Sequence, residues 1–193
     1  MKKIYLSIVA AVSLMFVSCT ADWLNTDPST AVPSDDAIKN IDDAQVALNG
    51  IYRLASAHSY YGDNYLYYAD CRGEDVQARI NKGAGRRVSP YYFFDVTADD
   101  NFNITLVWNQ PYKVIHQANS LIEKLDAGNA KPEEVARIKS EALAMRGLAL
   151  FDLTRLFGMP YTLDNGASLG VPIEIQTTLE DHAPERNTVA QCY

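Results

Sequence analysis

Three acidic residues lie close together in the chain, and two of them could supply the carboxyl groups of a glycosidase. Asp70, Glu74 and Asp75 fall within six residues, and glycoside hydrolysis uses two carboxyl groups that flank the scissile bond. The chain contains 24 Asp and Glu residues, so a cluster of this kind is also expected without any function. The sequence therefore predicts a protein that is not an enzyme, with a hydrolase kept as an alternative.

Metal and cofactor sites receive no support from the residue spacing. The three histidines are too far apart to supply a ligand pair, and the HExxH, CxxC and Walker A motifs are absent. Residues 99–110 match the first half of an EF-hand loop but lack the glycine at its sixth position and the glutamate at its twelfth. The sequence predicts no metal ion and no cofactor.

Aromatic side chains and nearby charged residues form the remaining candidate site. Five tyrosines fall within residues 60–68, and two more follow a polar loop. Tyrosine suits both buried packing and stacking on a sugar ring, and for residues 60–68 the sequence favours packing in the core. A stacked sugar also needs polar side chains that hydrogen-bond its hydroxyls. The candidate ligand-binding residues are therefore Arg72, Asp75, Arg86, Tyr91 and Tyr92.

The elements that must position these side chains belong to a chain of ordinary globular composition. Of its 193 residues, 48% are hydrophobic and 21% charged, which excludes collagen-like and fully disordered proteins. The 24 acidic residues outnumber 17 basic ones, for a net charge of −7. This balance excludes nucleic acid as a partner and disfavours electrostatic adhesion to anionic lipid, because both need a basic surface.

The N-terminus has the pattern of a bacterial lipoprotein signal. Two lysines precede an uncharged stretch at residues 4–17, which is shorter than the roughly 20 apolar residues needed to span a bilayer. Phe16-Val17-Ser18-Cys19 then resembles a lipobox, in which Cys19 receives lipid. We expect a signal peptide at residues 1–18 and a lipidated N-terminus and tether at residues 19–39. Several acyl chains on one cysteine would anchor the protein stably in a membrane.

Apolar residues recur at helical spacing in three segments. A first helix is predicted to begin near Asn40, whose side chain can cap it, with one apolar stripe from Ala44 to Ala55 that includes Tyr52. A second is predicted from the stripe at residues 108–125, with Pro111 in its first turn.

The third helix is predicted from Pro132 to the stop at Gly158. The second and third helices are joined by a short loop, so we expect an antiparallel hairpin. A short helix is also predicted near residues 62–70, and an extended connection over residues 161–187.

Two local patterns add detail to this arrangement. Arg137 and Glu141 are four residues apart and can pair on one helix face; we interpret them as an ion pair that anchors the hairpin, with a ligand contact as the alternative. Thr188 and Gln191 have the spacing of a capping box, which predicts the start of another helix. We therefore expect residues 40–193 to be the N-terminal part of a longer helical domain.

Four motifs follow one another in a specific order. They comprise residues 24–28 with 47–52, residues 108–119, residues 141–160, and residues 186–193. The second runs from Trp108 to Asn119, and the third contains Glu141, Arg146 and the final Gly158-Met159-Pro160. In this order they resemble the SusD/RagB family of outer-membrane nutrient-uptake lipoproteins, over nearly the whole chain.

The resemblance implies an all-α fold of tetratricopeptide-like helix hairpins with long irregular loops. It also implies a non-enzymatic lipoprotein of the cell outer membrane, facing the exterior. Such a protein captures an oligosaccharide or other nutrient for a TonB-dependent transporter of the SusC type. The alternative is a structural or adhesive surface lipoprotein that binds partner proteins through its helix hairpins.

Overall fold

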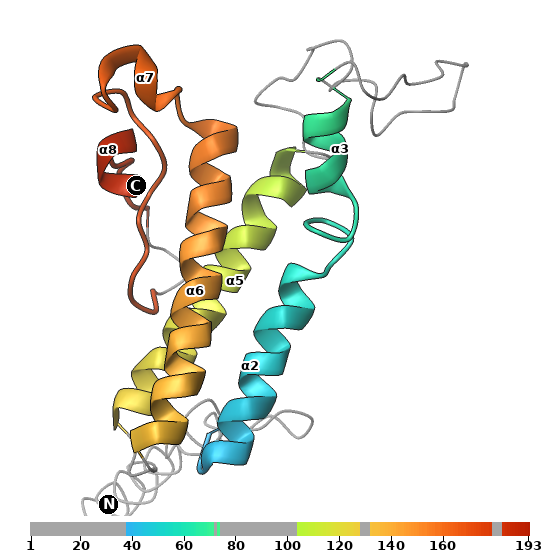
Figure 1. The fold of residues 1–193 in the computed structure, drawn as a ribbon, viewed down its shortest axis with the longest axis vertical. Coiled ribbons are helices and arrows are strands. Elements are labelled where there is room, and N and C mark those ends of the chain that lie inside the picture. Colours follow the sequence, from blue (N-terminus) through green and yellow to red (C-terminus); the bar gives the residue numbers. More distant parts are fainter. Residues whose placement is uncertain (1–37, 72, 74–103, 128–131, 179–182) are drawn as a thin grey trace, which may run out of the picture. The chain divides into compact units, whose positions relative to one another are not determined.

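The computed structural model describes residues 38–71, 73, 104–127, 132–178 and 183–193, and this part of the chain is α-helical (Figure 1). Its long helices are α2 (Ile41–Ala55), α5 (Ile104–Ala127) and α6 (Pro132–Phe157), and its short ones are α3 (Asn64–Asp70), α7 (Tyr161–Asp164) and α8 (Val189–Cys192). None of the helices in the described ranges is both long and apolar enough to cross a membrane. The predicted all-α fold class is confirmed, whereas the tetratricopeptide-like arrangement stays a prediction.

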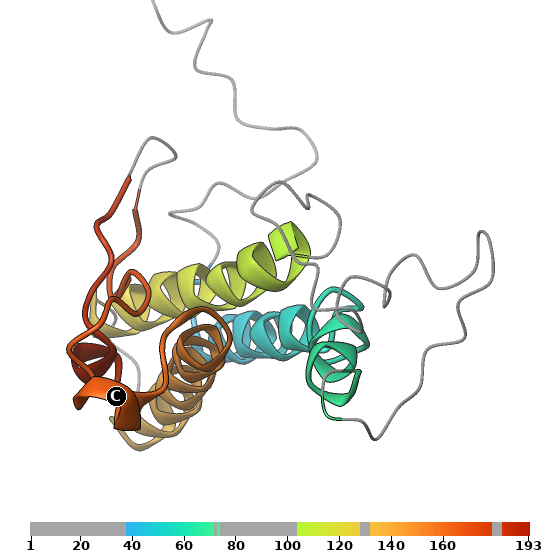
Figure 2. The ribbon, with the colours of Figure 1, turned by 90° about the horizontal axis from the view of Figure 1, so that it is seen from above.

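α5 and α6 run antiparallel as the predicted hairpin, and α2 packs against both of them (Figures 1 and 2). The core between the three helices contains fully buried residues from each of them: Leu48, Ile51, Ile115, Leu121, Ile138 and Leu153. Burial of each such side chain contributes about 1.5–3 kcal/mol. The apolar stripes read from the sequence are therefore the surfaces that hold the bundle together.

The start of α2 is capped as the sequence predicts. The Asn40 side chain accepts a hydrogen bond from the Asp43 backbone N–H at 3.0 Å, which satisfies a donor that has no partner within the helix. The predicted stripe is buried except at Tyr52, which is 43% exposed. Tyr52 therefore lies at the edge of the α2 stripe, with its hydroxyl available for a polar contact.

Pro111 does not lie in the first turn of its helix, and this prediction was wrong. α5 begins at Ile104, so Pro111 lies inside the helix. Proline lacks the N–H that would bond the carbonyl four residues earlier, which favours a helix start at this position. Tertiary contacts hold the preceding turn in place: Val107 is fully buried, and Gln110 Nε2 donates to the Leu54 carbonyl at 2.9 Å.

α6 begins and ends where the sequence predicts. Pro132 is its first residue, Glu133 and Glu134 occupy the first turn, and Phe157 is its last residue before Gly158. Arg186 Nη2 donates to the Phe157 carbonyl at 2.7 Å. A cation at this position stabilises the negative end of the helix dipole.

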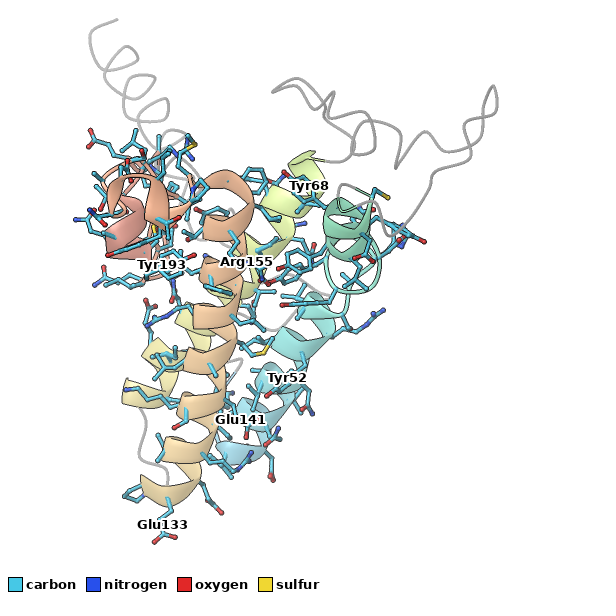
Figure 3. All side chains as sticks on the ribbon, turned by 45° about the horizontal axis from the view of Figure 1, so that its top comes forward. Tyr52, Tyr68, Glu133, Glu141, Arg155 and Tyr193 are labelled. Atoms are coloured by element: carbon cyan, nitrogen blue, oxygen red, sulfur yellow. The ribbon has the colours of Figure 1, made fainter. Side chains whose placement is uncertain are left out.

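The capping box at Thr188 is also confirmed, and it starts α8. α8 packs tightly against the chain that follows α7, because a Cβ added at Gly170 would lie 2.9 Å from the Cys192 sulfur. The Tyr193 ring lies 5.7 Å from the Phe151 ring, beside the end of α6 that carries Arg155 (Figure 3). The predicted extended connection over residues 161–187 is interrupted only by the short helix α7 within its described residues.

The predicted export and anchoring elements are not part of this description. Residues 1–18 and Cys19 lie outside the described residues, as does nearly all of the tether at residues 19–39. The predicted limits of these segments and of the domain at residues 40–193 stay predictions.

Candidate functional site

The ligand-binding residues predicted from the sequence lie outside the described residues. They are Arg72, Asp75, Arg86, Tyr91 and Tyr92. Of the acidic cluster, only Asp70 is described, as the last residue of α3. The described side chains form two polar clusters and a cleft along α5.

Three of the tyrosines gather around one buried carboxylate. Tyr60 and Tyr61 donate to Asp152 Oδ2 at 2.5 and 2.7 Å, and Tyr65 donates to Oδ1 at 2.5 Å. Asp152 is only 1% exposed, and its hydroxyl donors replace the water that the carboxylate loses on burial. We call these four residues the Asp152 cluster. It attaches α3, which carries Tyr65 and Tyr68, to the part of α6 near Arg155 (Figure 3).

Ring packing and electrostatics both stabilise the Asp152 cluster. The ring centroids of Tyr60 and Tyr61 are 4.4 Å apart, and those of Tyr61 and Tyr65 are 5.0 Å apart. Burial, followed by the hydrogen bond to Asp152, raises the pKa of Tyr61 to about 12 and also raises the pKa of Tyr60 and Tyr65. The three phenols stay protonated and keep donating, so this cluster is a structural element, as the sequence favoured.

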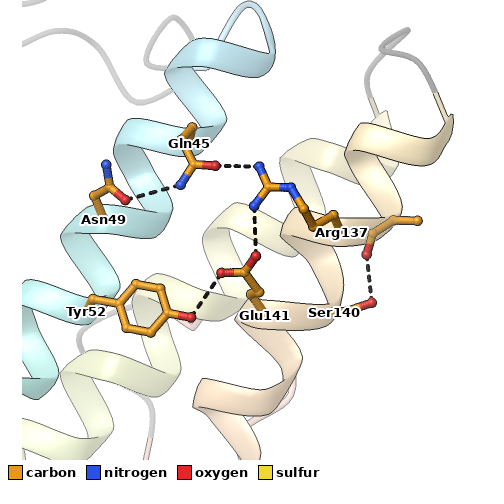
Figure 4. Close-up of polar contacts among 7 residues, drawn as sticks. Gln45, Asn49, Tyr52, Arg137, Ser140 and Glu141 are labelled. Atoms are coloured by element: carbon orange, nitrogen blue, oxygen red, sulfur yellow. Dashed lines mark hydrogen bonds and ion pairs between the residues drawn. The ribbon is translucent and has the colours of Figure 1, made fainter.

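A second polar network joins α6 to α2 (Figure 4). Arg137 and Glu141 form the predicted ion pair at 2.7 Å. Arg137 also donates to Gln45 Oε1 at 2.5 Å, and the Tyr52 hydroxyl donates to Glu141 at 3.0 Å. Gln45 in turn donates to Asn49 at 3.1 Å. The pair therefore links α6 to α2 and not to its hairpin partner α5, which corrects the predicted role.

A cleft of about 840 Å³ lies along one face of α5. Its floor contains the half-buried rings of Trp108 and Tyr112, whose centroids are 5.2 Å apart. A second depression of about 340 Å³ shares both rings. The volume of the larger cleft falls within the usual range of about 300–1,000 Å³ for ligand sites.

The wall of the cleft on α5 is polar, and its side chains are exposed except for the half-buried Gln117. It consists of Asn109, Lys113, His116 and Gln117. Trp108, Tyr112 and His116 follow one another at intervals of four residues, and so do Asn109, Lys113 and Gln117. Because residues at this spacing lie above one another on a helix, α5 presents two adjacent rows to the cleft.

The opposite wall comes from residues 171–178, an extended segment that we call the strap. Glu174, Gln176 and Thr178 line the cleft from this side. The Tyr112 hydroxyl donates to the Pro172 carbonyl at 2.9 Å. This bond, together with the ring's burial, fixes one end of the strap beside the aromatic floor.

The buried amide of Asn119 holds the centre of the strap. Its Nδ2 donates to the carbonyls of Glu174 and Gln176 at 3.1 and 3.0 Å, and the residue is 1% exposed. Its Oδ1 accepts from Arg146 Nη1 at 2.9 Å, and the same guanidinium nitrogen donates to the Ile175 carbonyl at 3.3 Å. Side chains from both helices of the hairpin therefore position the strap.

The far end of the strap is held by Glu123. Its carboxylate accepts from the Thr177 hydroxyl and from the Thr177 backbone N–H, both at 2.7 Å. These two hydrogen bonds lower the pKa of Glu123. The carboxylate therefore stays ionised and retains the strap at neutral pH.

Residues 166–170 have the Gly-x-Ser-x-Gly spacing of an esterase nucleophile elbow, which the prediction of a non-enzyme did not take into account. Such an elbow presents its serine on a turn between a strand and a helix. Here the hydroxyl of Ser168 donates to Asp164, and the two glycines face α8. The motif is therefore part of the packing around α8.

Within the described ranges, no group of three or more His, Cys, Asp or Glu side chains is placed to hold a metal ion. Cys71 and Cys192 are both free thiols. Burial raises the pKa of the Cys71 thiol, which makes it a poor nucleophile at neutral pH.

The sequence signals for these features differ in strength. Asp152 is an acid between two buried positions of α6, Ala149 and Leu153, and a charge at a core position of a helix is a detectable signal. By contrast, Asn109, Lys113 and His116 have the pattern of any solvent-exposed helix face. Their place in a cleft depends on the strap, which approaches α5 from more than 50 residues further along the chain.

A family model described as "Starch-binding associating with outer membrane", of the SusD-like type, matches residues 22–193. A SusD-like protein of Formosa agariphila, P2, is 28% identical over 162 residues; the match covers 83% of this chain and 31% of that protein. The chain thus spans about a third of the length of the relatives it matches.

The chain is also similar to solved structures, including one from the SusD superfamily. A SusD superfamily protein from Bacteroides thetaiotaomicron is 66% identical, with a TM-score of 0.74 over 79% of this chain and 34% of its own. A structure from Bacteroides vulgatus described as a putative sugar binding protein is 37% identical, with a TM-score of 0.71 over 81% of this chain and 34% of its own.

Proposed function

Because the chain belongs to the SusD-like family, we propose that the protein binds oligosaccharides at the outer membrane without cleaving them. The observation that carries the proposal is the cleft along α5, which combines an aromatic floor with polar walls. The description of the family model and that of the solved Bacteroides vulgatus relative support a sugar as the ligand.

The side chains of the cleft suit the chemistry of a sugar. The rings of Trp108 and Tyr112 offer flat apolar faces on which the C–H face of a pyranose ring packs. Amide and carboxylate groups, such as those of Asn109 and Glu174, can hydrogen-bond the hydroxyls at the edge of the ring. A site of this kind binds by contact area and hydrogen-bond geometry, and it needs no metal ion.

The membrane attachment belongs to the same proposal. Residues 1–18 act as a signal peptide, and Cys19 carries the lipid that holds the protein in the outer membrane, facing the exterior. Mass spectrometry of the N-terminal peptide tests this step, with an acylated Cys19 as the expected result. A Cys19→Ser variant should leave the membrane fraction, and an unmodified thiol at Cys19 in the mature protein would contradict the anchor.

The partner in this proposal is a TonB-dependent transporter of the SusC type, which receives the captured oligosaccharide. Affinity purification of the tagged, full-length protein from the outer membrane tests this step. Recovery of a large β-barrel transporter is expected. Recovery of other surface proteins without a transporter, and without saccharide binding, would favour the adhesive alternative.

Saccharide binding is tested by a glycan array, followed by calorimetric titration of the best ligand with the full-length protein. Asn109→Ala and His116→Ala are suitable variants because both side chains are exposed and line the cleft. Each is expected to weaken binding about fivefold to tenfold. Glu134→Ala, at an exposed position in the first turn of α6, is the matched control.

Two outcomes would contradict the proposal. If the protein binds no saccharide, the proposed function is wrong. If a saccharide binds with the same affinity to the wild type and to both cleft variants, the cleft is not its binding site. Parallel variants Arg72→Ala and Arg86→Ala test the residues predicted from the sequence. Incubation with the bound polysaccharide should leave its chain length unchanged, because the protein binds without cleaving.

A further inference from the structure

The strap is held against α5 and α6 mainly through its backbone. Tyr112, Asn119 and Arg146 donate to the carbonyl oxygens of residues 172, 174, 175 and 176. A main-chain carbonyl is the same acceptor whatever side chain follows it. The side chains at positions 174 and 176 can therefore change without loss of these hydrogen bonds.

The same side chains face the cleft. Glu174, Gln176 and Thr178 line it, whereas Thr177 bonds Glu123 and Ile175 is 61% exposed. This alternation is that of an extended chain, in which every second side chain points to the same side. The strap thus presents a carboxylate, an amide and a hydroxyl in a row, opposite the polar wall of α5.

We propose that Glu174 and Gln176 are specificity-determining residues of the cleft, and that Asn119 and Arg146 are the positioning residues that hold them there. This inference rests on the proposed function, since it assumes that the cleft binds a saccharide. Epimeric sugars differ in the direction of a hydroxyl. A fixed hydrogen-bonding group rejects the epimer whose hydroxyl it cannot meet, because a buried polar group is then left unpaired.

Substitutions of the specificity residues and of the positioning residues are expected to change saccharide affinities in different ways. Changes at Glu174 or Gln176 alter which hydroxyls find a partner, so they change the ratio of affinities between saccharides. Removal of Asn119 frees the carbonyls of residues 174 and 176 and releases the wall as a whole. Its loss weakens the binding of all saccharides by a similar factor and leaves their ratio unchanged.

The experiment uses the full-length protein and calorimetric titration with maltoheptaose, xylohexaose, mannohexaose and hexameric galacturonate. Glu174→Gln should weaken the tightest neutral ligand relative to galacturonate by about tenfold, because it removes both an acceptor and a negative charge. Gln176→Ala should change the ratios among the neutral ligands by about fivefold or more. Glu185→Gln neutralises an exposed acid that lies C-terminal to the strap and outside the cleft, and it serves as the control.

Hydrogen exchange provides a readout that does not depend on the ligand. In Asn119→Ala, the amides of residues 173–178 should exchange about tenfold faster than in the wild type, while those of α2 stay unchanged. Unchanged exchange in the strap would overturn the positioning role. Arg146→Lys, which retains a positive charge but loses the planar guanidinium, should give the same effect in weaker form.

The outcomes separate the two proposals. A wild-type protein that binds no saccharide, either in this titration or on the glycan array, contradicts the proposed function, and the specificity role falls with it. A wild-type protein that binds, combined with affinity ratios in Glu174→Gln and Gln176→Ala equal to those of Glu185→Gln, overturns the specificity role alone. Ratios that shift in these two variants while the melting temperature stays constant support it.

Discussion

The Asp152 cluster and the strap lie against the same helix, α6, but they are held by opposite means. In the Asp152 cluster, three phenol hydroxyls converge on one carboxylate, so every bond depends on the side chains of both partners. At the strap, Asn119 and Arg146 bond main-chain oxygens, so only one partner of each bond is a side chain. The Asp152 cluster specifies residue identity on both sides of each bond. The strap does so only where the Thr177 hydroxyl donates to Glu123, and its bonds to Asn119 and Arg146 specify residue identity on one side only.

The two regions therefore differ in role: the Asp152 cluster stabilises the helix bundle, and the strap presents side chains for ligand binding under the proposed function. The Asp152 cluster fixes α3 on α6, and exchange of its members is expected to be destabilising, because a buried polar atom without a partner is costly. The strap has a path that is fixed mainly through its backbone, and residues 174, 176 and 178 line the cleft. The region that is held through its backbone is therefore the one that can vary its chemistry without losing its position.

The largest expected effect is at Asp152. Asp152→Ala leaves the hydroxyls of the buried Tyr60 and the half-buried Tyr61 and Tyr65 without their acceptor, and it should lower the free energy of unfolding by about 3–5 kcal/mol. Urea denaturation followed by far-ultraviolet circular dichroism measures this change. Asp152→Asn keeps one acceptor oxygen and should cost less. A loss below about 1 kcal/mol in Asp152→Ala would show that the cluster is not a stabilising element.

The strap should respond with a smaller global effect. In Asn119→Asp, Arg146 keeps an acceptor, but the two strap carbonyls lose their donor and face a carboxylate. We expect a loss of about 1–2 kcal/mol in the free energy of unfolding, with exposure of the strap to limited proteolysis. The proteolytic site should lie within residues 171–178. Resistance equal to that of the wild type would mean that the backbone bonds are dispensable.

Alkaline pH should affect the Asp152 cluster selectively. The pKa of Tyr61 is about 12 in the folded protein, because of burial and the hydrogen bond to Asp152, against about 10 in an unfolded chain. The stabilisation is complete below pH 10, and it is lost as pH rises toward 12, since the unfolded chain releases its proton first.

This pH dependence is measured from the free energy of unfolding between pH 8 and pH 12. In Tyr61→Phe, the slope against pH over this window should be shallower than in the wild type by about one proton. Tyr60 and Tyr65 also have raised pKa values, so a slope should remain in the variant. Equal slopes in both proteins would contradict the coupling between Tyr61 and Asp152.

The smallest effect is expected in the network between α2 and α6, which serves as a solvent-exposed reference for both regions. Tyr52→Phe removes the hydroxyl that donates to Glu141 and should change the free energy of unfolding by about 0.5 kcal/mol or less. The reason is that water can replace the lost bond. If Tyr52→Phe lowered the free energy of unfolding as much as Asp152→Ala, burial would not explain the difference in stability between the two polar clusters.

Much of the fold was predictable because helices carry local signals. The Asn40 cap, the start of α6 at Pro132 and the capping box at Thr188 all depend on residues within one turn, and all three are confirmed. Pro111 was misplaced because its local preference for a first turn was outweighed by the burial of Val107 and by the hydrogen bond from Gln110 to Leu54, which lies 56 residues away in the sequence.

The site was far less predictable. Trp108 and Tyr112 were assigned to the helix stripe, and in the structure they form both an edge of the core and the floor of the cleft. The ion pair of Arg137 and Glu141 was correctly predicted from its spacing, but its partners on α2 were not. The five ligand-binding residues that were predicted from the sequence lie outside the described residues and stay predictions: Arg72, Asp75, Arg86, Tyr91 and Tyr92.

The amino-acid sequence by itself determined the helices, the antiparallel hairpin and the family, because stripes, caps and ordered motifs are properties of neighbouring residues. Only the tertiary structure decided that three tyrosines would bond Asp152 and that the strap would run along α5 to form a cleft. These contacts join residues separated by more than 50 positions. Such pairings depend on how the helices pack, which no local spacing encodes.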